Sequence, residues 1–146
     1  MKALLIVNPS SGGEQAQEYE QLAEEKLREA FSEVVVKHTE KEGDATRFAS
    51  EAAAEFDSVF AMGGDGTVNE AVNGLAPHDK RPNFGFFPLG TVNDLARALA
   101  IPLDPKEAIE SFAVDHTRKI DIGQVNQDYF TNVVAIGMIP AAINNV

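Results

Sequence analysis

The chain of 146 residues contains no cysteine, no long apolar run and no excess of basic residues. Without cysteine, disulfides, thiolate zinc sites and cysteine nucleophiles are excluded. No apolar run approaches the roughly 20 residues that a bilayer-spanning helix needs. The apolar segment at residues 2–7 is too short for a secretory signal. A cytoplasmic protein is therefore expected.

Positive charge is scarce. The 12 Lys and Arg residues stand against 23 Asp and Glu residues, which gives a formal net charge of −11. Nucleic-acid binding is not expected, because it requires clustered basic residues that neutralise phosphates. The same charge would be repelled by an anionic membrane surface, so membrane contact requires a local patch or another part of the protein. Since 44% of the residues are hydrophobic and 24% are charged, the composition is that of a globular domain.

Short apolar runs alternate with helical patterns along most of the chain. Strands are expected at residues 2–7, 34–36, 57–62 and 84–87, and helices at residues 14–31, 44–55, 67–75, 91–99 and 105–113. Asp44 is the expected N-cap of its helix. Continuous apolar strands that alternate with helices are typical of a parallel sheet covered on both faces. We therefore predict an open, doubly wound, mostly parallel α/β sheet, formed by residues 1–116.

The pattern changes near residue 117. Residues 119–125 and 129–135 flank a turn at residues 126–128 and predict an antiparallel hairpin. We expect residues 117–146 to form this hairpin and to begin a second, β-rich domain. Self-association into a homodimer is a further expectation, because residues 129–139 would expose apolar strand surface without a partner.

The most informative segment is GGDGTVNE at residues 63–70, where an apolar strand stops and a helical pattern begins. Gly63, Gly64 and Gly66 allow positive φ angles and a close approach of the backbone to an anion, at which the first helical N–H groups would point. Asp65 offers a carboxylate to a metal ion or a ribose hydroxyl. The segment predicts a nucleotide-phosphate loop, and the alternative is an ordinary strand-to-helix turn.

The other loops decide between these two interpretations. In an open α/β sheet, ligands bind beyond the carboxyl ends of the strands, so the loops that follow four strands share one rim. These loops carry amides, hydroxyls and short polar side chains, and the candidates are Asn8, Pro9, Ser10, Ser11, Gly12, Thr39, Gly90, Thr91, Asn93 and Asp94. Four such loops on one rim predict a nucleotide cradle. Asp65 and Asp94 could bind one Mg²⁺ together, because hard cations prefer carboxylate oxygens.

For several polar residues, the sequence allows either contact with a ligand or a purely structural role. Asn69 and Glu70 stand where they could contact a nucleotide, but a glutamate in a first helical turn is also a common partner of the helix dipole. Arg97 could contact phosphate or form an ion pair with Asp94. The histidines do not have the spacing of metal ligands. We expect each to lie at the surface or to support a site without contacting its ligand. They are His38, His78 and His116.

GGDGTVNE at residues 63–70, followed by PLGTVNDLARAL at residues 88–99, resembles the catalytic domain of the diacylglycerol kinase family of lipid kinases. Sphingosine kinases and, more distantly, NAD kinases and phosphofructokinases are related to it. The resemblance extends over residues 6–132. It implies transfer of the γ-phosphoryl group of ATP, with Mg²⁺, to a lipid hydroxyl such as that of diacylglycerol. The enzyme would be cytoplasmic and act transiently at the inner face of the membrane.

The resemblance also implies which residues act. By the family pattern, residues 8–12, Thr39, residues 64–70 and Thr91 contact ATP, and Asp94 joins the network around the phosphates and the metal. Asp65 and Asp94 are thus the predicted catalytic and metal-binding carboxylates. This agrees with the chemistry, since phosphoryl transfer needs positioning and charge neutralisation more than covalent catalysis.

The sequence departs from the family in two ways. Members are longer, and the resemblance places their catalytic glutamate in a second, β-rich domain. The 146 residues therefore resemble the N-terminal, nucleotide-binding part, which we expect to bind MgATP weakly and to be inactive alone. Glu14 stands where the family usually has a basic residue. The alternatives are an NAD kinase-like enzyme, which residues 88–99 disfavour, and a non-catalytic nucleotide-binding module.

Overall fold

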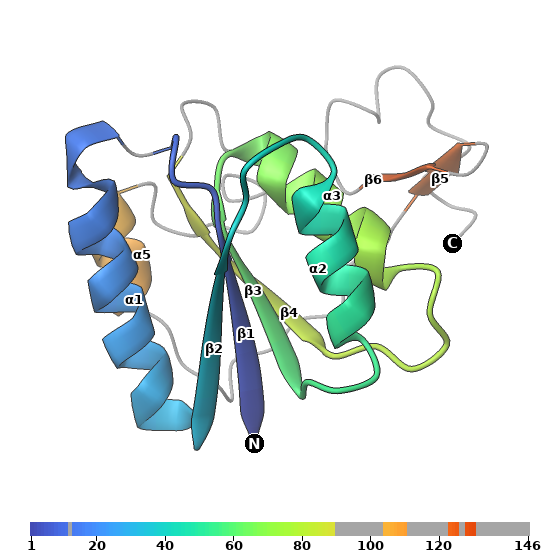
Figure 1. Cartoon of the computed structure of the whole chain (residues 1–146), viewed down its shortest axis with the longest axis horizontal. Helices are drawn as coiled ribbons and strands as arrows, with labels where there is room; N and C mark the ends of the chain where they lie inside the picture. Colours follow the sequence, from blue (N-terminus) through green and yellow to red (C-terminus); the bar gives the residue numbers. More distant parts are fainter. Residues whose placement is uncertain (12, 90–103, 111–122, 126–127, 131–146) are drawn as a thin grey trace.

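A four-stranded sheet forms the centre of the molecule in the computed structural model, which describes residues 1–11, 13–89, 104–110, 123–125 and 128–130. The strands are β1 (Lys2–Val7), β2 (Glu33–His38), β3 (Ser58–Gly63) and β4 (Asn83–Pro88). They lie in the order β2-β1-β3-β4, and every neighbouring pair is parallel (Figure 1). The predicted parallel sheet is confirmed.

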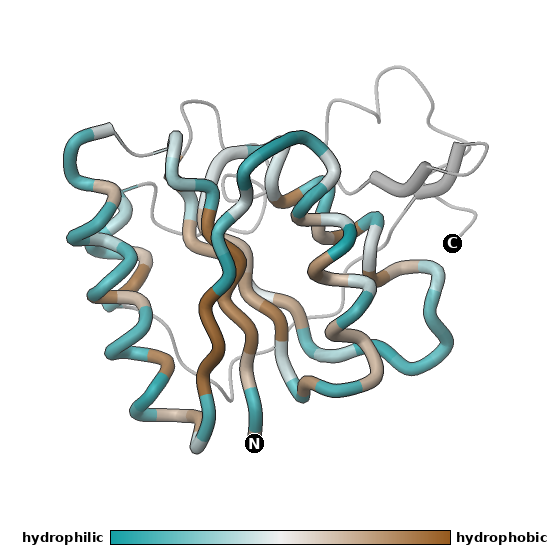
Figure 2. The backbone as a smooth tube through the Cα atoms, in the orientation of Figure 1, coloured by the Kyte–Doolittle hydropathy of each residue, from teal (hydrophilic) through white to brown (hydrophobic). Residues whose placement is uncertain are grey.

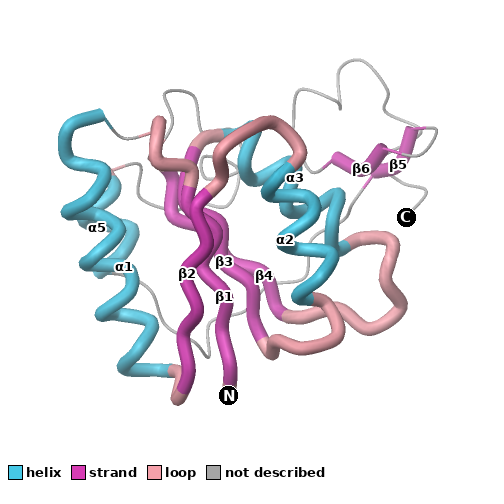
Figure 3. Tube along the Cα trace, in the orientation of Figure 1, coloured by secondary structure: helices cyan, strands magenta, loops and turns pink. Residues whose placement is uncertain are grey.

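Helices cover both faces of this sheet. The helical elements are η1 (Gly13–Gln15), α1 (Ala16–Ala30), α2 (Asp44–Ala52), α3 (Asp65–Leu75) and α5 (Pro105–Glu110). Figures 1 and 3 show α1 and α5 on one face and α2 and α3 on the other. The predicted doubly wound arrangement is therefore confirmed, and the apolar strands of Figure 2 lie between polar outer helix surfaces.

Strand β1 is buried from both sides and explains the two layers. Successive side chains of a strand point to opposite faces of the sheet. Leu5 lies in the apolar cluster that includes Leu27 of α1, whereas Leu4 and Ile6 lie in the cluster that includes Ala49 of α2. All five of these side chains are fully buried. Burial of one such leucine or isoleucine stabilises the fold by about 1.5–3 kcal/mol.

Helix α1 has the predicted amphipathic character. Ala23 and Leu27 are buried against the sheet, and Tyr19 packs partly buried beside them. On the outer face, Arg28 Nη2 lies 3.0 Å from Glu24 Oε1, four residues earlier. The helix begins at residue 16 instead of 14 because residues 13–15 form a single 3₁₀ turn.

Other element boundaries differ from the predictions. Helix α2 ends at residue 52 instead of 55, and α3 begins at residue 65, so that the glycine segment supplies its first turn. Asp44 is not the N-cap: Gly43 holds that position with φ +92°. The Asp44 carboxylate instead accepts hydrogen bonds from the preceding loop. The expected helix at residues 91–99 and residues 111–113 of the next one lie outside the described residues.

A second, two-stranded sheet pairs β5 (Gly123–Val125) with β6 (Asp128–Phe130) in antiparallel register. This confirms the predicted hairpin pairing, while the second domain and the homodimer stay predictions. Among the described helices, none combines the length and apolar character of a membrane span.

Candidate functional site

The chain reverses its direction of travel across the sheet between β1 and β3. From β1 the chain moves outward to β2, then crosses back to β3 on the other side of β1. Such a switch point separates the loops that follow the two strands and leaves a crevice at their carboxyl ends. The loop after β2 joins this rim, because the Thr39 N–H donates to the Val7 carbonyl at 2.8 Å.

A groove of about 540 Å³ opens at this place. Its volume is within the roughly 300–1,000 Å³ that is usual for small-molecule sites. Its walls come from the loop after β1, the loop after β2 and the first turns of α3. The lining residues are Asn8, Pro9, Ser10, Thr39, Glu40, Lys41, Glu42, Ala45, Thr67 and Glu70.

Asn8 joins the first loop to its neighbours. The Asn8 backbone N–H donates to the Met62 carbonyl at 3.0 Å. The Asn8 Oδ1 accepts from the backbone N–H of Ser10 at 3.1 Å and from the Ser10 hydroxyl at 2.7 Å. The Asn8 Nδ2 donates to Thr67 Oγ1 at 3.4 Å. One side chain thus shapes the first loop and ties it to α3.

The glycine segment packs tightly at one position and leaves space at another. A Cβ atom on Gly63 would lie 2.7 Å from Thr67 Oγ1 and 3.3 Å from Asn8 Cβ, so only glycine fits between them. At Gly66 the described residues outside its own helical turn place no atom within 4 Å of the corresponding position. The described part of the chain therefore does not require glycine at residue 66.

The predicted positive φ angles of this segment are wrong. In the part of the chain that the structure describes, the glycines with positive φ are Gly13 and Gly43. Gly64 has an extended backbone with φ −92° and precedes α3 directly. Close approach, and not a left-handed backbone, is the reason for glycine at Gly63.

The loop after β2 is organised by Asp44. This carboxylate is 3% exposed. Its Oδ2 accepts the backbone N–H groups of Glu40 at 2.8 Å and Lys41 at 3.0 Å, and its Oδ1 lies 3.2 Å from Arg47 Nη2. The hydrogen bond from Glu40 is the main cause that lowers the pKa of Asp44, against the opposing effect of burial, and those from Lys41 and Arg47 add to it.

Asp44 therefore predicts a specific acid sensitivity. Because its pKa is lowered in the folded chain, its ionised form stabilises the fold above the ordinary value of 3.8, and this contribution is lost as the pH falls through the folded pKa. Urea unfolding of the wild type and of Asp44→Asn should show a free-energy difference that is constant above pH 4 to 5 and shrinks below it. A difference independent of pH would contradict the prediction.

Glu70 connects the same loop to α3. Its Oε1 accepts the backbone N–H of Gly43 at 2.9 Å, and its carbonyl accepts the Thr46 hydroxyl of α2 at 2.9 Å. The charged side chains in the described groove lining are mostly acidic: there are three glutamates, among them Glu70, and one lysine, Lys41. An anionic ligand would therefore need a metal ion or backbone N–H groups for its charge.

The predicted site residues fall into three sets. Six line the groove: Asn8, Pro9, Ser10, Thr39, Thr67 and Glu70. Others occupy the same loops or the first turns of α3 without being part of its lining: Ser11, Gly63, Gly64, Asp65, Gly66 and Asn69. The rest lie outside the described residues: Gly12, Gly90, Thr91, Asn93 and Asp94, together with Arg97 and His116.

Sequence reasoning found only Thr39 on the wall that follows β2 and missed the residues after it. Glu40, Lys41, Glu42 and Ala45 line the groove without having been predicted. A signal was present, since these residues follow a strand at the predicted rim and surround Gly43.

The described residues hold no group of three His, Cys, Asp or Glu side chains that could bind a metal ion. Asp65 is the one member of the predicted Mg²⁺ pair within the described chain. The described histidines are not part of the groove lining: His38 pairs with Glu20, and His78 Nε2 lies 2.9 Å from Ser50 Oγ.

Comparison with known proteins identifies the family to which the chain is similar. The family model for the "Diacylglycerol kinase catalytic domain" matches residues 2–125. The chain is 46% identical over 140 residues to a diacylglycerol kinase of Bacillus subtilis (strain 168), covering 94% of this chain and 46% of that protein. It is 45% identical over 139 residues to one of Staphylococcus aureus (strain MRSA252), covering 94% and 44%.

A solved structure gives the same result. The crystal structure of a diacylglycerol kinase from Bacillus anthracis str. Sterne superposes with a TM-score of 0.83 at 37% identity, covering 88% of this chain and 45% of that one. The chain spans about half the length of the curated relatives it matches.

Proposed function

Since the chain belongs to the diacylglycerol kinase catalytic-domain family of lipid kinases, we propose that its groove binds ATP with Mg²⁺. In the whole protein, the γ-phosphoryl group would pass to a lipid hydroxyl such as that of diacylglycerol. The enzyme would act from the cytoplasm, transiently at the inner face of the membrane. The 146 residues by themselves are expected to bind MgATP without transferring phosphate.

The observation that supports this proposal best is the coincidence of the groove with the sheet's switch point and with the start of α3. Backbone N–H groups at a helix N-terminus favour phosphate, because they are unpaired and carry partial positive charge. Gly66 lies in this first turn, and among the described residues no other segment fills the space beside its backbone. A phosphate group fits where a Cβ atom is missing.

The acidic lining favours a metal ion as part of this ligand. Among the described lining residues, Glu40, Glu42 and Glu70 outnumber Lys41, so additional positive charge would help to bind a triphosphate. When bound, Mg²⁺ would withdraw charge from the phosphate oxygens, and Asp65 with Asp94 would hold it. Thr67 places a hydroxyl on the groove lining, and Asn8 ties it to the first loop, where the Ser10 hydroxyl donates to Asn8 Oδ1.

Gly66→Ala provides the sharpest test. The added methyl group meets no atom of the described residues within 4 Å outside its own helical turn, so the free energy of unfolding should stay equal or rise by up to about 1 kcal/mol through helix propensity. If the phosphates of ATP approach this backbone, calorimetry should show MgATP binding at least about 10-fold weaker. Unchanged affinity in a folded Gly66→Ala protein would refute this placement of the phosphates.

Asp65→Ala tests the proposal that Asp65 helps to hold Mg²⁺. We expect MgATP binding to be lost in this variant and ATP binding by the wild type to weaken when a chelator removes Mg²⁺. NAD⁺ should not compete; competition by NAD⁺ would favour the NAD kinase-like alternative. Phosphate transfer from ATP to diacylglycerol in vesicles by the whole protein separates the kinase from a non-catalytic nucleotide-binding module.

A further inference from the structure

The wall of the groove formed by the loop at residues 39–43 has little apolar anchoring. Residues 40–43 are exposed and contribute nothing to either buried cluster. The loop projects above the sheet between β2 and α2 (Figure 1). Its shape must therefore come from hydrogen bonds.

Carboxylates accept three backbone N–H groups of this short loop. The N–H groups of Glu40 and Lys41 donate to the Asp44 carboxylate, and the N–H group of Gly43 donates to the Glu70 carboxylate. Hydrogen bonds to a charged acceptor are about twice as strong as neutral ones. Two side chains from two different helices thus hold the loop from both of its ends.

We propose that Asp44 and Glu70 are positioning residues that clamp the loop 39–43 as one wall of the ATP groove, so that Glu70 serves nucleotide binding through Gly43. The inference rests on the proposed function for the identity of the ligand. Neither carboxylate is required to touch ATP. The clamp holds the loop in place before the ligand arrives, which spares binding the entropic cost of ordering it.

Asp44 is suited to this role by its surroundings. It is buried at the start of α2, and Arg47 on the same helix lies beside its other oxygen at 3.2 Å. Its lowered pKa keeps it ionised near neutral pH. Both loop N–H groups therefore meet a full negative charge whose position is fixed by the helix.

Glu70 couples the loop to the other wall. It lies on α3, whose first turn is the proposed phosphate site, and it reaches across 27 residues of chain to Gly43. Gly43 has φ +92°, a backbone conformation that favours glycine, and this presents its N–H to α3. Thr46 adds a second link between the helices. The distance between the two walls is thereby set before a nucleotide binds.

The experiment compares Asp44→Ala, Glu70→Ala, Glu70→Gln and the double alanine variant, by calorimetry with MgATP and by residue-resolved amide hydrogen exchange without ligand. Each single alanine variant should weaken MgATP binding about 10-fold. The double variant should add less than about 3-fold to this, because one loop is released in either case. Glu70→Gln retains an acceptor oxygen and should restore affinity to within about 3-fold of the wild type.

Hydrogen exchange separates positioning from direct contact. Without ligand, the amides of Glu40 and Lys41 should exchange at least about 10-fold faster in Asp44→Ala, and that of Gly43 should do so in Glu70→Ala. Glu51→Gln is the matched control: it removes a negative charge from α2 at a residue that is 55% exposed and lies 3.9 Å from Arg47, away from the loop. Its affinity and exchange should equal those of the wild type.

Each result decides a different point. Unchanged exchange in both alanine variants, or additive losses in the double variant, would overturn the clamp. If the wild type binds no MgATP, the proposed function fails, and the exchange data still show whether the carboxylates hold the loop. If Asp44→Ala does not fold, as judged by circular dichroism, Glu70→Ala and its rescue by Glu70→Gln decide alone.

Discussion

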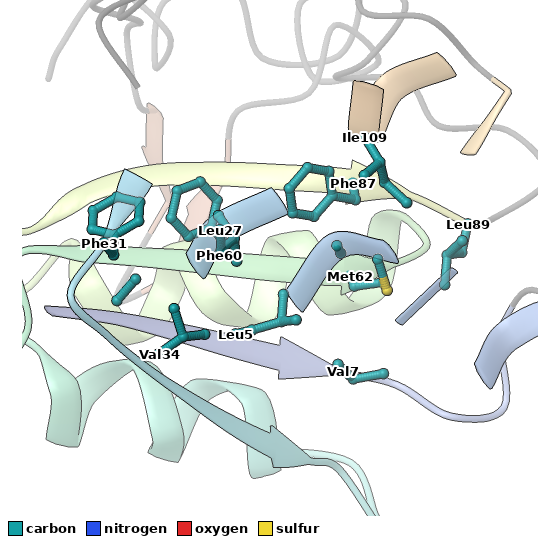
Figure 4. Close-up of a cluster of buried hydrophobic side chains, with 12 residues drawn as sticks. Leu5, Val7, Leu27, Phe31, Val34, Phe60, Met62, Phe87, Leu89 and Ile109 are labelled. Atoms are coloured by element: carbon teal, nitrogen blue, oxygen red, sulfur yellow. The ribbon is translucent and has the colours of Figure 1, made fainter. Parts of the chain in front are cut away.

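Replacing Phe60 by alanine is expected to lower the free energy of unfolding by about 3–5 kcal/mol. Phe60 stands in the middle of β3 and is 5% exposed. Its ring meets Phe31 edge-on at 5.8 Å between centroids and stacks with Phe87 at 5.9 Å (Figure 4). Each such pair adds about 0.5–1.5 kcal/mol beyond the buried area. Urea denaturation of both proteins measures the loss.

Gly85 on the neighbouring strand provides a matched control for this prediction. A Cβ atom at Gly85 would lie 2.6 Å from two ring carbons of Phe60, so Gly85→Ala should destabilise the wild type. In the Phe60→Ala background the ring is absent, and the same methyl group would partly fill the cavity. A double-mutant cycle should therefore show strong coupling. Additive effects would mean that the ring does not occupy the space above Gly85.

Gly74→Ala is expected to destabilise the protein by about 1–3 kcal/mol through overpacking. Helix α2 packs closely against α3 at Gly74. A Cβ atom there would lie 2.3 Å from the Thr46 carbonyl oxygen, 2.9 Å from Ala49 Cβ and 3.0 Å from the Ser50 backbone nitrogen. Two of these are backbone atoms, which cannot rotate away. The helices would have to separate.

Gly66→Ala controls for the change in helix propensity, because it adds the same methyl group to the same helix at a place where no other described segment comes within 4 Å. Both variants gain up to about 1 kcal/mol of helix propensity, so the difference between their unfolding free energies isolates the clash. Equal stabilities would contradict the close contact at Gly74. Thermal or urea unfolding of the two variants in parallel is sufficient.

The strands and the layers could be predicted because their signals are local. Every residue of β3 is buried, which a continuous apolar run indicates directly. The face of α1 was readable in the same way, since the periodicity that places Leu27 inward also places Glu24 and Arg28 outward. The groove residues of the first loop and of Thr39 were found because the carboxyl ends of parallel strands share one rim.

The same local rules failed at Asp44 and at Gly63, where side-chain contacts decide the outcome. Asp44 follows the usual pattern of an N-cap, but its carboxylate meets the N–H groups of Glu40 and Lys41 and leaves the cap position to Gly43. Gly63 has the composition of a turn, yet it is glycine because Thr67 and Asn8 occupy the space of a Cβ atom. Asp44 bonds to the loop directly before it, whereas the Asn8 atom beside Gly63 belongs to a distant segment of the chain.

The sequence by itself determined the parallel α/β arrangement and the kind of loops at its rim, because hydrophobic period and loop composition act over a few residues. The tertiary structure alone decided which of these loops form the groove. The meeting of Gly43 with Glu70, 27 residues later, depends on how α2 packs on α3, and this in turn depends on the small volume of Gly74. No local pattern carries that information, because the contact exists only after the helices have packed on the same face of the sheet.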